Sequence, residues 1–298
     1  MAFVAVATKS SGSNRGIKRT RTPYLLLLPG ISWLLVFFIL PLFTLASTST
    51  QTPAPSGETG AYVQTFRFAN YWDALSGARD QFIRSIVYAL IATVLALAIS
   101  YPLAYGIAFK AGKWKNLLLV LVIAPFFTSF LLRTIAWQQI LGSQGPAVLV
   151  LRTLHILGPQ SGLTASGFAV VTGMTYNFLP FMTLPLYASL ERIDPRTLEA
   201  SSDLYANGIT TFRKVTFPLS LPGVVAGTLL TFIPAAGDYI NATLLGNPNT
   251  KMIGNVIESR FFDIVDYPTA AALSFILMAA ILILVTIYVR RAGTEELV

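Results

Sequence analysis

The chain has 298 residues, of which 54% are hydrophobic and only 11% are charged. A soluble domain carries about a quarter charged residues, so this composition indicates a membrane protein. The net charge of +8 would favour nucleic-acid binding in a soluble protein, but an excess of basic residues on cytoplasmic loops explains it here, and no nucleic-acid partner is expected. The absence of cysteine excludes disulfides and thiolate metal sites, and the single histidine, His155, excludes any site that needs two.

The N-terminal residues 1–22 include basic but no acidic side chains, which predicts a disordered cytoplasmic tail. The apolar segment 24–45 follows, and it is long enough to cross a hydrocarbon core of about 30 Å, which takes about 20 helical residues. A cleaved signal peptide is the alternative, but its apolar core usually has only about 7–15 residues. We therefore predict a first span here, within a transmembrane domain at 23–290 that precedes a short cytoplasmic tail at 291–298.

The segment 46–80 begins with a Ser, Thr and Pro-rich run and continues with scattered aromatic residues, which predicts an external loop with a short interfacial helix in its later half. The segment 142–162 is too short to span, so we expect a re-entrant or interfacial external helix, with His155 at that surface. The loop 245–266 is also predicted to be external. Five more apolar segments complete an all-α protein with six transmembrane helices, and they lie at 82–109, 116–141, 163–190, 220–244 and 267–289.

The distribution of charge predicts the orientation of these spans. With the N-terminus in the cytoplasm, six spans return the C-terminus to the cytoplasm, and most of the 21 lysines and arginines then lie on cytoplasmic segments. The external loops hold only Arg67, Arg79, Arg152, Lys251 and Arg260. The sequence therefore predicts a multi-pass protein of the cytoplasmic (inner) membrane with both termini inside.

The loop 191–219 is the only long polar run between apolar segments. Asp194 followed by Pro195 predicts a helix start, because an Asp side chain caps free N–H groups and proline fits the first helical position. Asn207 and Gly208 predict its end, since both residues tolerate the left-handed conformation. A second short helix is expected at about 211–217, ended by Pro218.

This loop resembles the cytoplasmic signature of permease subunits of bacterial ABC importers, in which Glu-Ala-Ala is followed by a glycine and a hydrophobic-x-Leu-Pro close. Glu199, Ala200, Val215 and Pro218 stand at the family's spacing, whereas Tyr205 occupies the usual glycine position. An ordinary solvated loop is the alternative. The resemblance implies a coupling helix that seats in a cleft of a separate ATPase, with coupling residues Arg196, Glu199, Ala200, Asp203, Tyr205 and Gly208.

Two ionisable residues stand out within the predicted spans, where charge is costly and therefore a sign of function. They are Asp238 in 220–244 and Arg133 in 116–141. In one interpretation they neutralise one another as a structural pair. In the other, Asp238 faces a translocation path and attracts a cation.

Residues beside Asp238 favour the second interpretation. Pro234 and Gly237 predict a broken or kinked helix, which would expose backbone carbonyls to a polar cavity. Tyr239 and Trp137 offer aromatic faces for cation–π contacts, although both residue types are also ordinary at a membrane interface. The predicted substrate pathway therefore comprises Asp238, Tyr239, Arg133 and Trp137.

The phrases LLRTIAW followed by ILG, and GDYI followed by LLG, resemble the permease subunits of polyamine (spermidine/putrescine) ABC importers, over about residues 20–290. The resemblance implies a type I importer permease fold that works by alternating access. It also implies a second homologous permease, identical or not, two copies of an ABC ATPase and an extracytoplasmic solute-binding protein. Relatives that import ferric iron, thiamine or phosphonate share much of the pattern.

The sequence contains no GxxxxGK[ST], HExxH or GxSxG motif. It is therefore expected to be a transport subunit and no enzyme, with no cofactor or metal of its own, because ATP and Mg²⁺ would bind the partner ATPase. A secondary transporter driven by an ion gradient is the competing class, but the two halves show no internal inverted repeat. A membrane-embedded enzyme would need a catalytic constellation that is missing.

Overall fold

The computed structural model describes residues 22–55, 57–158 and 162–292. The predicted tails, 1–22 and 291–298, lie almost wholly outside the described residues. The chain divides into two compact units, Met1–Leu45 and Ala46–Val298. The fold is all-α, as predicted, except for one small hairpin.

The first unit is a helix rich in leucine and phenylalanine. It runs through α1 (Thr22–Leu34), a π-helical turn (Leu35–Ile39) and the start of α2 (Leu40–Ser49). The continuous helix Leu26–Ser49 has 24 residues, or about 36 Å at 1.5 Å per residue. This length suffices to cross a hydrocarbon core and includes most of the predicted first span.

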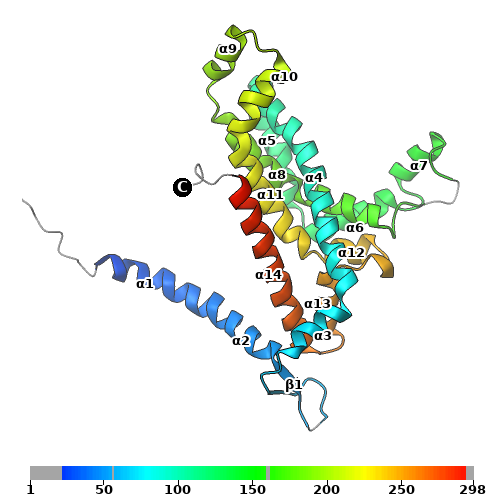
Figure 1. The fold of residues 1–298 in the computed structure, drawn as a ribbon. Coiled ribbons are helices and arrows are strands. Elements are labelled where there is room, and N and C mark those ends of the chain that lie inside the picture. Colours follow the sequence, from blue (N-terminus) through cyan, green and yellow to red (C-terminus); the bar gives the residue numbers. More distant parts are fainter. Residues whose placement is uncertain (1–21, 56, 159–161, 293–298) are drawn as a thin grey trace, which may run out of the picture. The chain divides into compact units, whose positions relative to one another are not determined.

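The second unit holds the hairpin and the remaining helices (Figure 1). Its elements are β1 (Gln51–Pro53), β2 (Tyr62–Gln64), α3 (Ala69–Gly77), α4 (Arg79–Phe109), α5 (Lys115–Ile123), α6 (Phe130–Leu141), α7 (Pro146–Thr153), α8 (Gly167–Glu191), α9 (Pro195–Asp203), α10 (Gly208–Thr211), α11 (Phe217–Ala236), α12 (Ile240–Leu245), α13 (Ile253–Phe262) and α14 (Tyr267–Ala292). Short turns of tighter or wider helix lie at Gly112–Trp114, Ala124–Phe127, Phe212–Thr216 and Pro248–Thr250.

The segments predicted to be external are more structured than the sequence indicated. The hairpin pairs β1 and β2 antiparallel, with Thr52 opposite Val63, where only an irregular loop was expected. α3 and α7 take the places of the two predicted short helices. His155 follows α7 in the left-handed conformation, with φ of 58°.

Four helices among the described residues are long and apolar enough to cross a membrane: Leu26–Ser49, Arg79–Lys110, Gly208–Ala236 and Tyr267–Arg291. A bent pair, Gly112–Phe127 and Phe130–Thr153, makes a fifth if it is counted as one span. α8 is long enough at 25 residues but less apolar, and it lies at the centre of the unit. This arrangement is compatible with six spans.

The predicted third span, 116–141, is not one straight helix. It bends by 97° between α5 and α6. Pro125 has no N–H to donate, and Thr128 and Ser129 take extended ψ angles of 141° and 138° that end the helical path. The second part of this span, α6, therefore runs in a different direction from the first part, α5.

Small residues let the central helices α4, α8 and α11 approach closely. Gly223 and Gly227 form a small-xxx-small pair on α11, a pattern that brings helix backbones together in membranes. A Cβ atom at Gly223 would lie 2.5 Å from Ser189 Cβ and 2.7 Å from the Pro185 carbonyl oxygen, both on α8. The absence of a side chain at Gly223 is therefore a condition of the α8–α11 contact.

The substitution Gly223→Ala is expected to lower the stability of the chain by about 1–3 kcal/mol, because a methyl group would force these helices apart. Gly106→Ala is the matched control, since a Cβ atom there meets nothing within 4 Å and alanine favours a helix by up to about 1 kcal/mol. Thermal unfolding of the purified variants in detergent measures both effects. Equal midpoints for Gly223→Ala and the unmodified chain would contradict the close contact.

Candidate functional site

The exposed segment that joins α8 to α11 starts as the sequence predicts. Asp194 precedes α9, and its Oδ1 atom accepts a hydrogen bond of 2.9 Å from the Arg196 N–H. Pro195 occupies the first helical position. This cap satisfies one of the free N–H groups at the start of the helix.

The predicted end of this helix is wrong. α9 ends at Asp203, and Tyr205, with φ of 58°, takes the left-handed position that was expected at Asn207 and Gly208. The Tyr205 N–H donates to the Ser202 carbonyl over 2.9 Å, and the Ala206 N–H donates to the Ser201 carbonyl over 3.1 Å. These two bonds form the Schellman closure of a helix, which most often has glycine at the left-handed residue.

Asn207 starts a helix and does not end one. Its Oδ1 atom accepts a hydrogen bond of 2.8 Å from the Thr210 N–H and so caps α10. Gly208 becomes the first residue of α10, and helical structure then continues through the π turn Phe212–Thr216 into α11. Pro218 does not stop it: this residue lies just after the π turn, inside a helix that runs without interruption from Gly208 to Ala236.

All six predicted coupling residues lie on the surface of this segment. Two contacts hold the segment in place. Ile193 is buried with Leu190, and the Ser201 hydroxyl lies 2.9 Å from that of Thr211. α9 and α10 lie at one end of the α4–α8–α11 bundle, and α3 and α13 lie at the opposite end (Figure 1). The predicted coupling residues with exposed side chains or backbone are Arg196, Glu199, Ala200, Asp203, Tyr205 and Gly208.

An ion pair lies at the start of this segment. Lys115 Nζ lies 2.5 Å from Glu191 Oε1, which joins the start of α5 to the last residue of α8. The hydrogen bond from Lys115 lowers the pKa of the Glu191 carboxyl, and the Tyr187 hydroxyl lowers it further. On the acid side, the pair is therefore lost only when the pH falls through that lowered pKa, so it is intact at neutral pH.

The predicted substrate-pathway residues include Asp238 and Tyr239, which lie at a break in the helix after α11. α11 ends at Ala236, and α12 begins at Ile240, so the predicted break beside Gly237 is present. Asp238 lies in this break and is only 7% exposed. Its Oδ1 atom accepts a hydrogen bond of 3.0 Å from the Asn241 N–H, and its Oδ2 atom accepts one from Asn241 Nδ2.

Asn241 connects Asp238 to a buried polar cluster that was not predicted. Its Oδ1 atom accepts from Asn177 Nδ2 over 3.1 Å, and Asn177 Nδ2 also lies 3.0 Å from Thr134 Oγ1. All three side chains are fully buried, and they join α6, α8 and α12. The signal available in the sequence was a polar residue at an otherwise apolar position in each span.

Arg133 and Asp238 do not form an ion pair in the described part of the chain. The Arg133 guanidinium instead lies over two rings, with its Cζ atom 5.8 Å from the Phe126 centroid and 5.7 Å from that of Phe130. Its Nε and Nη1 atoms are buried and find no hydrogen-bond partner among the described residues. The interpretation of the two residues as a mutually neutralising pair therefore does not hold for this conformation.

The two aromatic residues occupy different surroundings. Tyr239 is 43% exposed beside the break, and its carbonyl accepts a hydrogen bond of 3.0 Å from Asn255 Nδ2. The Trp137 ring packs edge-on against Tyr176 at 5.4 Å between centroids, and both line a cavity of about 270 Å³. Tyr239 thus lies at the helix break with Asp238, whereas Trp137 lines a separate cavity with Tyr176.

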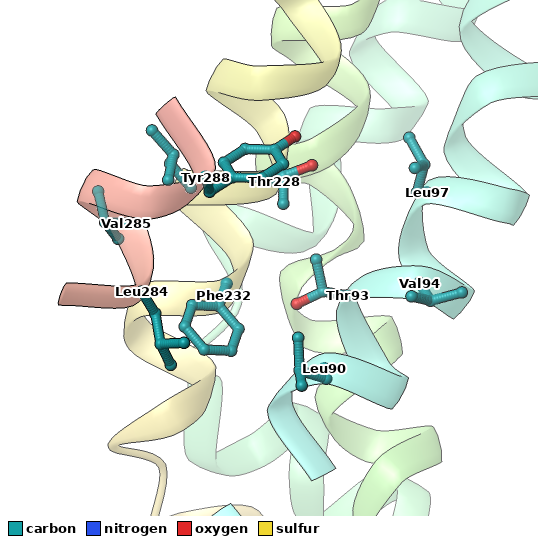
Figure 2. A pocket seen from close by; sticks show the side chains of 10 residues that line it. Leu90, Thr93, Val94, Leu97, Thr228, Phe232, Leu284, Val285 and Tyr288 are labelled. Atoms are coloured by element: carbon teal, nitrogen blue, oxygen red, sulfur yellow. The ribbon is translucent and has the colours of Figure 1, made fainter. Parts of the chain in front are cut away.

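Another cavity, of about 370 Å³, lies between α4, α11 and α14 (Figure 2). Leu90, Phe232 and Leu284 line it, and its polar groups are the hydroxyls of Thr93, Thr228 and Tyr288. The Thr93 hydroxyl already donates to the Ala89 carbonyl within its own helix. A lining of this kind suits hydrocarbon and offers no counter-charge for a cation.

Together, the long apolar helices, the polar cluster at a helix break and the exposed segment at one end define a polytopic membrane transport subunit. A family model described as "Binding-protein-dependent transport system inner membrane component" matches residues 76–292. The chain belongs to this family, which confirms the predicted class of transport subunit.

Sequence relatives agree with this assignment. The chain is 35% identical over 260 residues to the spermidine/putrescine transport system permease protein PotB of Haemophilus influenzae, covering 87% of this chain and 90% of that protein. It is 34% identical over 262 residues to PotB of Escherichia coli, covering 87% and 94%.

The fold is similar to that of a solved importer. In a bacterial ABC transporter involved in the import of the acidic polysaccharide alginate, one chain matches with a TM-score of 0.70 at 18% identity, covering 94% of this chain and 98% of that one. This likeness supports the predicted permease fold.

Proposed function

We propose that this chain is a permease subunit of an ATP-driven importer that moves a polyamine, spermidine or putrescine, inward across the cytoplasmic membrane by alternating access. The exposed α9–α10 segment, anchored to the central helices through buried residues, is the observation that carries the proposal. A chain without its own phosphate loop needs a surface that receives the motion of a separate ATPase.

The assembly would contain a second permease, two ATPase copies that bind ATP and Mg²⁺, and an extracytoplasmic solute-binding protein. Both termini and the loop 191–219 would face the cytoplasm, within a membrane domain of residues 23–290. This orientation follows the excess of lysine and arginine on those segments. The opposite end, with α3 and α13, would then face the binding protein.

The polyamine substrate is supported by the relatives and by the chemistry of the break. Asp238 is the one acidic residue within the predicted spans, and it lies where Gly237 interrupts the helix. A carboxylate and free carbonyl groups favour an ammonium group. Tyr239 would add an aromatic face, and Trp137 with Tyr176 would offer another along the path.

The unpaired guanidinium of Arg133 needs an acceptor that the described part of the chain does not provide. In the assembly, a carboxylate of the second permease would satisfy it and keep its positive charge from opposing a cationic substrate. Importers of ferric iron, thiamine or phosphonate are the alternatives within the same class. A gradient-driven transporter is the alternative outside it.

The test is ATP hydrolysis by the co-expressed assembly in lipid nanodiscs, with its binding protein, in the presence of spermidine, putrescine, thiamine, phosphonate or ferric iron. We expect spermidine or putrescine alone to stimulate hydrolysis. Stimulation by another solute would overturn the polyamine assignment and keep the importer. If no ATPase co-purifies, the ATP-driven mechanism itself is wrong.

A further inference from the structure

The turn between α9 and α10 has a backbone that suits glycine but holds a large aromatic side chain. Tyr205 has φ of 58°, a region in which a Cβ atom crowds the following carbonyl group. The Schellman bonds from Tyr205 and Ala206 fix this conformation. Tyrosine therefore costs free energy at a position where glycine would close the same turn without strain.

Within the described residues, the Tyr205 ring makes no contact that would stabilise the fold. Tyr205 is 99% exposed, and within the described residues its ring and hydroxyl make no ring contact or hydrogen bond. Leu204 before it is 81% exposed, and Ile209 after it is 73% exposed. These three residues, here called the turn patch, follow one another around the tip of the segment.

Charged residues of both signs flank the turn patch. Glu199 and Asp203 come from α9, with Arg196 on the same helix, and Arg213 and Lys214 follow α10. All five are exposed, and none takes part in an ion pair in the described part of the chain. An aromatic and aliphatic centre with a charged rim is the composition of a protein interface.

The mixed charge argues for a protein partner and against a lipid surface. Segments that bind anionic headgroups are clusters of Lys and Arg, and Glu199 and Asp203 would weaken such binding. The turn patch also lies at the end of the bundle away from α3 and α13 (Figure 1). In the orientation proposed above, this end faces the cytoplasmic ATPase.

We propose that Tyr205 is the anchor residue of the turn patch: its ring inserts into an apolar pocket of the partner ATPase, with Leu204 and Ile209 around it, and so decides which ATPase this permease accepts. The inference rests on the proposed function. The strained left-handed backbone presents the ring outward from the helix end, and binding of the ring offsets the cost of that conformation. Tyr and Trp are the residues most often found as such anchors.

The experiment compares Tyr205→Gly with Tyr205→Phe in the complete co-expressed assembly. Glycine suits the backbone and removes the ring, whereas phenylalanine keeps both the ring and the strain. We expect Tyr205→Gly to weaken the affinity for the ATPase at least tenfold, with a thermal midpoint equal to or above that of the unmodified chain. Tyr205→Phe should retain the affinity, and Tyr205→Asn, which tolerates the left-handed region, should lose it.

The outcomes separate this inference from the proposed function. If the unmodified chain retains no ATPase, the proposed function and the inference both fail. If the unmodified chain and Tyr205→Gly retain the ATPase equally, only the inference fails. A Tyr205→Gly assembly that keeps its ATPase but loses activity only in nanodiscs of anionic lipid would assign the turn patch to the membrane surface and would also overturn the inference.

Discussion

The substitution Ala200→Pro is expected to abolish solute uptake while leaving the chain in the membrane. Proline in the interior of α9 would remove an N–H donor and clash with the carbonyl four residues earlier, at a cost of about 3 kcal/mol. A cost of this size lowers the population of the docked conformation about a hundredfold. α9 is exposed and lies outside the buried helices, so insertion and the core should be unaffected.

Glu199→Ala tests the same segment without breaking the helix. Glu199 is exposed and makes no ion pair in the described part of the chain, so its loss should leave the fold unchanged. If its carboxylate pairs with the ATPase, uptake should fall about tenfold, which corresponds to about 1.4 kcal/mol. Both variants are measured by uptake into proteoliposomes, with ATP hydrolysis recorded in parallel.

The control is Glu58→Ala, the same chemical change in the hairpin loop between β1 and β2. It should leave the number of ATP molecules hydrolysed per solute unchanged, whereas Glu199→Ala should raise it. Normal uptake by both α9 variants would mean that this segment is an ordinary solvated loop. The coupling role of residues 191–219 would then be withdrawn.

Strong local signals made part of this structure predictable. Apolar length placed the long helices α4 and α14, because a span needs about 20 such residues wherever it packs. Asp194 and Pro195 fixed the start of α9, since capping depends only on adjacent residues. Gly237 also marked the helix break from a local signal, because glycine is a poor helix former whatever surrounds it.

Proline shows where local signals are insufficient. Pro180 and Pro185 lie inside α8 without ending it, yet Pro125 lies at a bend of 97°. The difference lies in the residues that follow Pro125, because Thr128 and Ser129 take extended backbone and end the helical path, whereas the residues after Pro180 and Pro185 stay helical. From sequence, an intact kinked helix and a broken one were equally compatible with these prolines.

The prediction misplaced the turn after α9 because it considered only which residues favour the left-handed conformation. It could not include the contact between Ser201 of α9 and Thr211 of α10. Glycine is the better left-handed residue, which favoured Gly208. The hydrogen bond between the Ser201 and Thr211 hydroxyls joins the two helices, and with the Asn207 cap it leaves Tyr205 as the residue that must turn. No pattern of neighbouring residues contains that information.

The polar cluster could be predicted only in part. Asp238 was identified because a charge within a span is conspicuous. Thr134, Asn177 and Asn241 are single polar residues in three different apolar segments, and only the folded chain brings their side chains within hydrogen-bonding distance. Their meeting point is a property of helix packing and not of any one segment.

Replacing Asp238 by asparagine is expected to lower polyamine uptake about tenfold while the assembly stays intact. Asparagine keeps the volume and one oxygen that can accept from the Asn241 N–H, so the break and α12 should persist, but its amide nitrogen cannot accept the second bond, from Asn241 Nδ2. The negative charge is lost, and a tenfold fall in uptake corresponds to about 1.4 kcal/mol of lost attraction between that charge and the cationic substrate. The defect should be larger for spermidine than for putrescine, because spermidine carries more charge.

The matched control is Thr134→Val, which removes a hydroxyl from the same buried cluster without changing charge. If Asp238 acts only as a structural cap, both variants should shift the thermal midpoint and leave KM for uptake alike. If its charge attracts the cation, Asp238→Asn alone should raise KM. Asp238 is buried within the subunit and hydrogen-bonded to Asn241. In this conformation its negative charge would therefore attract the substrate through space and not by direct contact. Unchanged KM and maximal rate in Asp238→Asn would assign the carboxylate to holding the break in place.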